Sequence, residues 1–114
     1  MIPYGRQEIT NTDIEAVIDV LRSDFLTQGP VVEKFEKKVS GYCGASYAAA
    51  LNSATSALHV ACMALGVGPG DVVWTSPITF VASSNCALYC GASVDFVDID
   101  PVTYNICCNQ LSVK

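Results

Sequence analysis

Apolar side chains recur at helical spacing in the first part of the chain. One stripe consists of Ile14, Val17, Ile18 and Leu21. Asn11 or Thr12 lies just before this stripe and can cap the helix, and Glu15 completes a capping box with Thr12. The polar and glycine-containing segment 23–30 then breaks the pattern and predicts a loop.

A second helix is expected directly after that loop. The apolar residues that share one face of it are Val31, Val32, Phe35 and Val39. The charged residues on its other faces are Glu33, Glu36, Lys37 and Lys38. Gly41 and Gly44 are expected to end this helix.

Short apolar runs alternate with helical patterns in the rest of the chain. The expected elements are a strand at 47–51, a helix with apolar positions from 57 to 65, a turn at 66–71, a strand at 72–75, a helix at 79–89 and a strand at 94–99. Strands that alternate with helices predict parallel pairing, and runs that are apolar on both faces predict a sheet covered by helices. Three strands are too few for a complete sheet of this kind, which predicts that these residues are the front part of a larger protein.

Composition supports that interpretation. The chain has 114 residues, of which 51% are apolar and 15% charged, with a net charge of −5. This excludes a disordered tail and a basic surface for nucleic acid or an anionic membrane. No charged residue lies between Val39 and Gly70, and only five follow Gly70, which predicts that residues 41–114 are buried on most sides.

Targeting and cysteine patterns add further expectations. No run of 18 apolar residues and no secretory signal is present, which predicts a cytoplasmic protein. The six cysteines contain no CxxC pair, so we expect reduced thiols that pack as small apolar groups. A single histidine and unpaired spacing argue against a zinc site.

The segment Asn52–Ser56 is the first candidate site, because it joins an expected strand to the helix that follows. Free backbone N–H groups and hydroxyls at such a turn can bind a phosphate. The alternative is that Ser53 or Thr55 only caps the helix. The segment lacks the lysine and the glycine spacing of a nucleotide-binding P-loop.

Thr79 and Phe80 form the second candidate, at the expected start of the next helix. Phe80 can stack on a flat cofactor ring at the sheet edge where ligands of open α/β sheets bind, or it can be an ordinary core residue. The glycine-rich segment 66–70 leads into a strand and predicts a plain turn. His59 is interpreted as a packed helix residue. Asp98 and Asp100 are interpreted as capping or turn residues, with a metal pair as the weaker alternative.

An ordered set of motifs resembles the DegT/DnrJ/EryC1/StrS family of sugar aminotransferases over essentially the whole chain. The motifs are Tyr4–Gln7, Leu26–Pro30, Asn52–Leu58, Gly68–Asp71, Ser76–Ala82 and Val97–Asp100. The resemblance implies an α/β fold, namely an incomplete N-terminal part of a fold-type I large domain with a parallel sheet and flanking helices. It also implies an N-terminal arm with two helices at 1–40 and the start of the domain that binds pyridoxal phosphate at 41–114.

The resemblance further implies a reaction and roles for individual residues. Ala54 and Thr55 would bind the phosphate of pyridoxal 5′-phosphate, and Phe80 would stack on its ring. The residues implied in binding a UDP-sugar are Tyr4, Asp24, Phe25, Leu26, Thr27 and Ala54. The sequences of Asn52–Leu58 and Ser76–Ala82 most resemble those of the transaminases of pseudaminic acid synthesis. These enzymes transfer an amino group from L-glutamate to C4 of a UDP-linked 4-keto-6-deoxy-N-acetyl hexose and act as homodimers.

The sequence departs from the family at its catalytic centre. None of Lys34, Lys37, Lys38 and Lys114 matches the family's Schiff-base lysine, so we expect no catalytic residue here and no transamination by this chain alone. Two alternatives stay open, a dehydratase-type member that has histidine in place of the lysine and a non-catalytic product that pairs with a full-length subunit. A piece without function is the remaining hypothesis.

Overall fold

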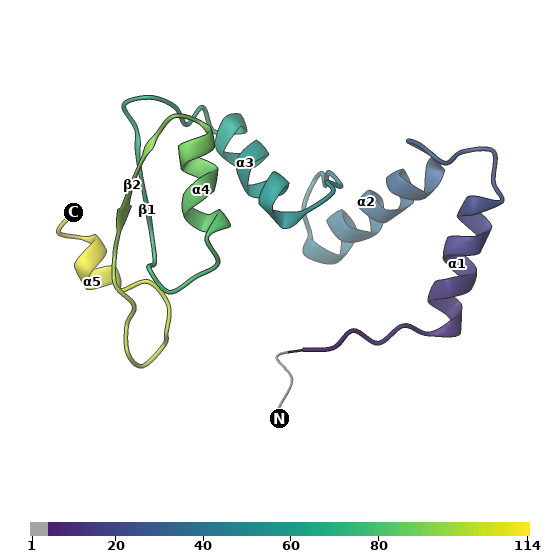
Figure 1. Cartoon of the computed structure of the whole chain (residues 1–114), viewed down its shortest axis with the longest axis horizontal. Helices are drawn as coiled ribbons and strands as arrows, with labels where there is room; N and C mark the ends of the chain where they lie inside the picture. Colours follow the sequence, from purple (N-terminus) through teal and green to yellow (C-terminus); the bar gives the residue numbers. More distant parts are fainter. Residues whose placement is uncertain (1–4) are drawn as a thin grey trace. The chain divides into compact units, whose positions relative to one another are not determined.

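The computed structural model describes residues 5–114. Its elements are α1 (Asn11–Leu21), α2 (Pro30–Cys43), α3 (Ala54–Ala64), β1 (Val72–Thr75), α4 (Ala82–Tyr89), β2 (Ser93–Phe96) and α5 (Cys108–Leu111) (Figure 1). The chain divides into two compact units, Met1–Ala50 and Leu51–Lys114, which are described separately below. The assignment of domains at 1–40 and 41–114 stays a prediction.

Helix α1 begins one or two residues earlier than its sequence pattern indicated. Thr10 is the N-cap, and its side chain accepts a hydrogen bond from the backbone N–H of Asp13 at 3.3 Å. The Asp13 carboxylate in turn accepts from the backbone N–H of Thr10 at 2.8 Å. The expected cap at Asn11 or Thr12, with Glu15 in a capping box, is therefore wrong. The capping box is formed by Thr10 and Asp13, which have the same spacing of three residues.

Helix α2 is bounded by the residues that helix ends favour. Pro30 occupies the first turn, where its missing N–H costs nothing. Gly44 has a φ of 66° and ends the helix in the left-handed conformation, as expected. Gly41 does not end the helix but lies within its last turn, so that part of the prediction is wrong.

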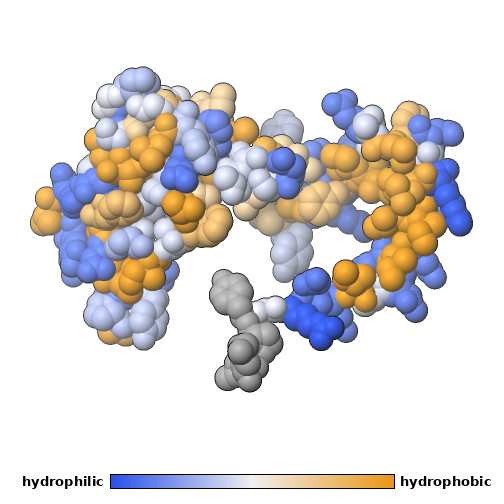
Figure 2. Space-filling model, in the orientation of Figure 1, coloured by the Kyte–Doolittle hydropathy of each residue, from blue (hydrophilic) through white to orange (hydrophobic). Residues whose placement is uncertain are grey.

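The apolar stripes of both helices face outward among the described residues. Neither α1 nor α2 contains a buried residue, and Val17 and Phe35 are 60% and 58% exposed. In Figure 2 apolar side chains cover much of the visible surface of α1. The periodicity thus predicted the helices correctly, while the partner of each stripe is not part of this unit.

The second unit is built on two parallel strands joined through α4, as the alternating pattern predicted. β1 pairs with β2 in a register that runs from Val72 opposite Ser93 to Thr75 opposite Phe96. Helix α3 packs against α4, and α4 contacts both strands (Figure 1). The buried side chains of the described residues are small, namely Ala82, Cys86, Ala87, Ala92 and Val97.

The predicted strand at 47–51 is not present. These residues have no strand partner within the described chain, and the N–H of Ala50 instead donates to the Glu36 carboxylate at 2.8 Å. A β-strand forms only where a neighbouring strand accepts and donates its backbone hydrogen bonds. An apolar run alone does not provide that neighbour. The sheet therefore has two strands rather than the three expected.

The other predicted elements differ mainly at their ends. The second strand is Ser93–Phe96 rather than 94–99, and beyond it Ile99 makes a single antiparallel bridge with Ile106. Helix α4 begins at Ala82, three residues later than expected, because the N–H groups of Ser83 and Ser84 first close tight turns onto Phe80 and Val81. The four-residue α5 was not predicted, since it is too short to carry a period.

Among residues 5–114, no helix combines the length and the apolar character that crossing a membrane requires.

Candidate functional site

The start of α3 leaves donors free for an anion. Ser53 is the N-cap, and its hydroxyl accepts from the N–H of Ser56 at 3.1 Å and donates to the Ser56 hydroxyl at 3.0 Å. The backbone N–H groups of Ala54 and Thr55 and the Thr55 hydroxyl have no hydrogen-bond partner in the part of the chain that is described. The two interpretations of this segment therefore apply to different residues, because Ser53 caps the helix while Ala54 and Thr55 keep their donors.

The electrostatics of this turn come from the backbone alone. The 11-residue α3 places roughly half a positive charge at its N-terminus. No lysine or arginine occurs between Lys38 and Lys114, so no cation of the second unit other than Lys114 can add to it. Lys114 is paired with the Asp95 carboxylate at 2.7 Å, which lowers the pKa of Asp95. An anion at this turn would be held by amide and hydroxyl donors.

Phe80 lies on the connection between β1 and α4 with its ring largely free. The side chain is 73% exposed, so it is not a core residue of the described chain. The turn around it is fixed by two bonds, from the N–H of Ile78 to the Ser76 hydroxyl at 3.2 Å and from the N–H of Ser83 to the Phe80 carbonyl at 3.0 Å. Phe80 therefore precedes α4 rather than starting it, and it presents an apolar ring outside the core.

These two features share one edge of the second unit. α3 and α4 both begin on the side of the unit where β1 and β2 end (Figure 1). Ligands of open α/β sheets bind at the carboxyl ends of the strands, where helix N-termini also gather. The fold thus brings Ala54, Thr55 and Phe80 to the same edge of the unit.

The loop 24–27 belongs to the first unit. Its start is fixed by Ser23, whose hydroxyl donates to the Val20 carbonyl at 2.8 Å and accepts from the N–H of Phe25 at 3.3 Å. Its end depends on Gly29, because a Cβ there would lie 2.8 Å from the Phe25 Cβ. A hollow of about 330 Å³ adjoins Phe25 between α1 and the start of α2.

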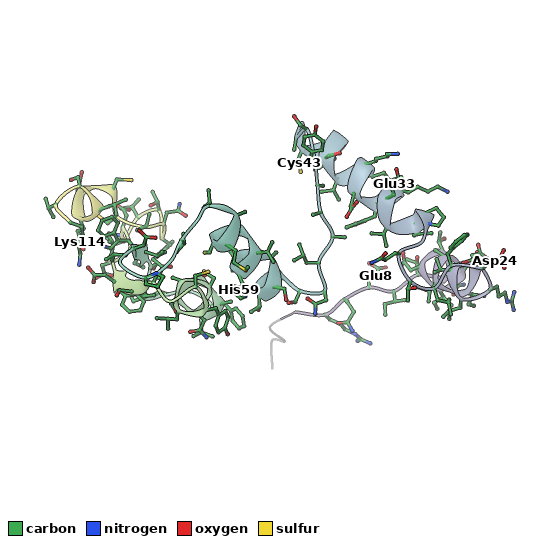
Figure 3. The ribbon with its side chains drawn as sticks, turned by 90° about the horizontal axis from the view of Figure 1, so that it is seen from above. Glu8, Asp24, Glu33, Cys43, His59 and Lys114 are labelled. Carbon is green, nitrogen blue, oxygen red and sulfur yellow. The ribbon has the colours of Figure 1, made fainter. Side chains whose placement is uncertain are left out.

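The loop residues predicted to bind substrate are exposed. Phe25 and Leu26 are 58% and 65% exposed, and Asp24 and Thr27 are exposed as well. Figure 3 places Asp24 on the loop that follows α1. Tyr4 lies outside the described residues. The structure therefore presents the loop as an accessible surface of its own unit.

The other candidates have structural roles. The Asp71 carboxylate accepts from the N–H of Gly68 at 2.8 Å and closes the turn predicted there. Asp100 accepts from the N–H groups of Val102 and Thr103 at 2.9 and 2.8 Å, and these bonds lower its pKa. The Asp98 carboxylate accepts from the N–H of Ile99 at 2.8 Å. Within residues 5–114 no group of three metal-binding side chains lies close enough to hold an ion.

Sequence reasoning missed the contact between Glu36 and the N–H of Ala50. The two residues are 14 positions apart, and no local pattern connects a helix glutamate with an amide in a later segment. Gln28 was expected only as part of the loop 23–30, and its positive φ of 51° was not predicted. The Gln-Gly-Pro sequence at the end of that loop was the available signal for an unusual backbone there.

Comparison with known proteins identifies the family. Residues 7–114 match the DegT/DnrJ/EryC1/StrS aminotransferase family. The chain is 44% identical over 105 residues to the spore coat polysaccharide biosynthesis protein SpsC of Bacillus subtilis, covering 92% of this chain and 27% of SpsC. It is 46% identical over 99 residues to a UDP-4-amino-4,6-dideoxy-N-acetyl-β-L-altrosamine transaminase of Campylobacter jejuni, covering 87% of this chain and 26% of that enzyme.

Solved structures agree with the sequence relatives. The proposed sugar aminotransferase Spr1654 of Streptococcus pneumoniae matches in its apo form with a TM-score of 0.93 and 36% identity, over 98% of this chain and 28% of that one. Structures of Spr1654 in PMP and PLP forms match equally well. The expected α/β fold class is confirmed, and the chain spans about a quarter of the length of the relatives it matches. The chain belongs to the DegT/DnrJ/EryC1/StrS aminotransferase family.

Proposed function

We propose that this chain provides the cofactor-phosphate site of a pyridoxal-phosphate-dependent sugar aminotransferase. Ala54 and Thr55 bind the phosphate, Phe80 stacks on the cofactor ring, and the loop 24–27 contacts a UDP-sugar. The observation that carries the proposal is the pair of free N–H groups and the free hydroxyl at the start of α3. The Spr1654 structure in its PLP form, which has the same fold over this region, supports the choice of cofactor.

The donor set fits a phosphate ester. A phosphate offers several acceptor oxygens, and the turn supplies two amide donors, one hydroxyl donor and the positive end of a helix dipole. No carboxylate lies between Val39 and Gly70 to repel the phosphate. Because Ser53 already caps the helix, binding a phosphate requires no rearrangement of α3.

Phe80 supplies the apolar contact that a flat heteroaromatic ring needs. Its exposed ring lies at the edge where α3 begins, and the bonds that fix its turn hold the backbone on both sides of it. A stacked aromatic contact of this kind contributes about 0.5–1.5 kcal/mol beyond the area it buries. The phosphate turn and Phe80 together would orient the cofactor ring.

The chemistry itself belongs to the cofactor. Bound pyridoxal phosphate supplies the electron sink that amino-group transfer requires, and the protein supplies binding and orientation. The described residues bind and orient, and no lysine of this chain matches the family's Schiff-base lysine. We therefore propose that the 114 residues alone do not transaminate.

The substrate is proposed from the sequences of the motifs and from one relative. The Campylobacter jejuni transaminase is 46% identical to this chain over 99 residues, which favours a UDP-linked 4-keto-6-deoxy-N-acetyl hexose with L-glutamate as donor. Ala54 would lie beside both the phosphate and the sugar nucleotide. A homodimeric parent and a cytoplasmic location are part of the same proposal, as is the domain division at residues 40 and 41.

A chimeric enzyme tests this function directly. Residues 7–114 replace the matching segment of the Campylobacter jejuni transaminase, and the 4-amino sugar product is measured by mass spectrometry. We expect the chimera to bind pyridoxal phosphate and to form product from L-glutamate and the 4-keto sugar. The matched control carries Ser53→Ala, which weakens the helix cap but leaves the proposed phosphate donors in place.

The outcomes separate the parts of the proposal. A folded chimera that does not bind pyridoxal phosphate contradicts the cofactor site. A chimera that binds the cofactor and consumes glutamate but forms no amino sugar contradicts the proposed substrate. Product formation by residues 1–114 alone contradicts the proposal that they do not transaminate.

A further inference from the structure

The cofactor site proposed above is divided between two helices. Ala54 and Thr55 lie at the start of α3, whereas Phe80 lies on the connection just before α4. The phosphate and the ring of one ligand are joined covalently, so the ligand reaches both places only when α3 and α4 keep a particular spacing. Residues that set this spacing therefore affect the site without touching the ligand.

Phe80 is attached to the first turn of α4. The N–H of Ser83 donates to the Phe80 carbonyl at 3.0 Å, and the hydroxyls of Thr79 and Ser83 share a hydrogen bond of 3.3 Å. Helix α4 contacts both strands as well as α3, so it links α3 to the sheet. A shift of α3 along α4 would therefore change the separation of Thr55 and Phe80.

Mostly small side chains are available for the contact between these helices. The buried residues of α4 are Ala82, Cys86 and Ala87. The half-buried residues of α3 are Thr55, Ser56, Ala57, His59 and Cys62. Small side chains form shallow ridges on a helix, which restrict sliding of one helix along another only weakly. His59 is the largest half-buried side chain of α3, so it is the one best able to fix the register.

His59 makes an aromatic contact with α4. Its ring centroid lies 5.2 Å from that of Tyr89, and the two ring planes are tilted by 58°. This separation is within the range at which aromatic rings attract each other. Figure 3 shows His59 beside α4. His59 follows Thr55 by one helical turn on the same face of α3, and Tyr89 is the last residue of α4.

We propose that His59 and Tyr89 are positioning residues that fix the spacing between the phosphate turn of α3 and the Phe80 ring. This role rests on the proposed cofactor site, because the spacing matters only to a ligand that contacts both places. Without the aromatic pair, α3 is free to shift along α4. The ligand then keeps its stronger contact, at the phosphate, and loses the stack on Phe80.

Three ligands separate a change of spacing from damage to either contact. Inorganic phosphate tests the turn alone, pyridoxamine tests the ring contact alone, and pyridoxamine 5′-phosphate needs both at once. Amide ¹H–¹⁵N titrations of the chain measure the three affinities. His59→Ala should leave the affinities for phosphate and pyridoxamine unchanged. It should weaken pyridoxamine 5′-phosphate binding by about 2- to 12-fold, which is the contribution of one aromatic stack.

Matched variants isolate the aromatic pair. Tyr89→Ala should have the same effect as His59→Ala, and the double variant should bind no more weakly than either single variant. His59→Phe keeps an aromatic ring and should restore the affinity for pyridoxamine 5′-phosphate. Val60→Ala is the control, because Val60 is the next residue of α3 and is 48% exposed. It should leave all three affinities unchanged, and circular dichroism checks that every variant keeps its helix content.

A measurement without ligand tests the spacing on its own. Nuclear Overhauser contacts between α3 and α4 should change in His59→Ala and be retained in His59→Phe. If they change while the original chain does not bind pyridoxamine 5′-phosphate, the positioning role stands and the proposed cofactor site is contradicted.

Two results would overturn the positioning role. One is a His59→Ala chain with unchanged contacts between the helices and unchanged affinity for pyridoxamine 5′-phosphate. The other is an equal loss of affinity for all three ligands, which would mean that His59 supports the turn or the stability of the unit.

Discussion

Replacing Thr55 by valine removes the proposed phosphate hydroxyl with little disturbance to α3. The Thr55 hydroxyl has no hydrogen-bond partner in residues 5–114, and Ser53 is the residue that caps the helix. Valine keeps the β-branched shape and has a similar helix propensity. Because the Thr55 hydroxyl has no partner, its removal leaves no other polar group without a hydrogen bond. The stability of the protein should therefore stay within about 0.5 kcal/mol of the original.

The expected loss lies in the affinity for the phosphate. A hydrogen bond to a charged group contributes about 1.5–3 kcal/mol, and about 1.4 kcal/mol corresponds to tenfold in a dissociation constant. Thr55→Val should therefore weaken binding of a cofactor phosphate by about 10- to 150-fold. Thr55→Ser, which keeps the hydroxyl, should bind within a few-fold of the original chain.

Equilibrium dialysis with pyridoxamine 5′-phosphate measures this effect. This ligand carries an amine in place of the aldehyde, so it cannot form imines with the exposed lysines Lys34, Lys37 and Lys38. Pyridoxamine, which lacks the phosphate, is the matched ligand and should bind the valine variant and the original chain equally. Its own affinity reports on ring contacts such as that with Phe80.

Two outcomes would refute the reasoning. One is a valine variant that binds pyridoxamine phosphate as tightly as the original chain. The other is an equal loss for pyridoxamine and pyridoxamine phosphate, which would mean that Thr55 contacts the ring or shapes the turn rather than binding the phosphate.

Further predictions concern the elements around the site. Gly44→Ala should destabilise α2 by about 1 kcal/mol in urea unfolding, because Gly44 has a φ of 66°, whereas Gly41→Ala within the helix should stabilise it by a similar amount. Glu36→Ala should raise the hydrogen-exchange rate of the Ala50 amide about tenfold, because that amide loses its acceptor, and an unchanged rate would contradict the contact. The hydrogen bond from the Thr10 amide lowers the pKa of Asp13, so the cap stabilises α1 only while Asp13 is ionised. The helix content of α1 should therefore be constant at neutral pH and fall as the pH drops below about 4 through the lowered pKa. Circular dichroism that is flat down to pH 2 would contradict this.

Periodicity predicted the helices well because helical spacing is a local property. The stripe from Ile14 to Leu21 lies in α1, and the apolar positions from Ala57 to Cys62 lie in α3, with Leu65 as its C-cap. The exact helix starts were less predictable, because Thr10 and Asp13 compete with other hydroxyl and carboxylate pairs nearby. Which pair closes depends on backbone geometry that the spacing does not determine.

The strands were harder to predict because their partners are remote in sequence. The runs at 72–75 and 93–96 pair with each other, whereas the equally apolar run at 47–51 has no partner in the described chain. At the site, the turn at 52–56 predicted free donors correctly, while only the structure separated the capping role of Ser53 from the open donors of Ala54 and Thr55. The Glu36–Ala50 contact had no local signal.

The most direct test of the phosphate site is an amide ¹H–¹⁵N titration of the chain with pyridoxamine 5′-phosphate and, separately, with pyridoxamine. The account predicts that the amide signals of Ala54 and Thr55 shift most with the phosphorylated ligand and much less with pyridoxamine. Signals near Phe80 should shift with both ligands. Amide shifts of equal size with both ligands at Ala54 and Thr55, or largest shifts elsewhere in the chain, would contradict the assignment of these residues to the cofactor phosphate.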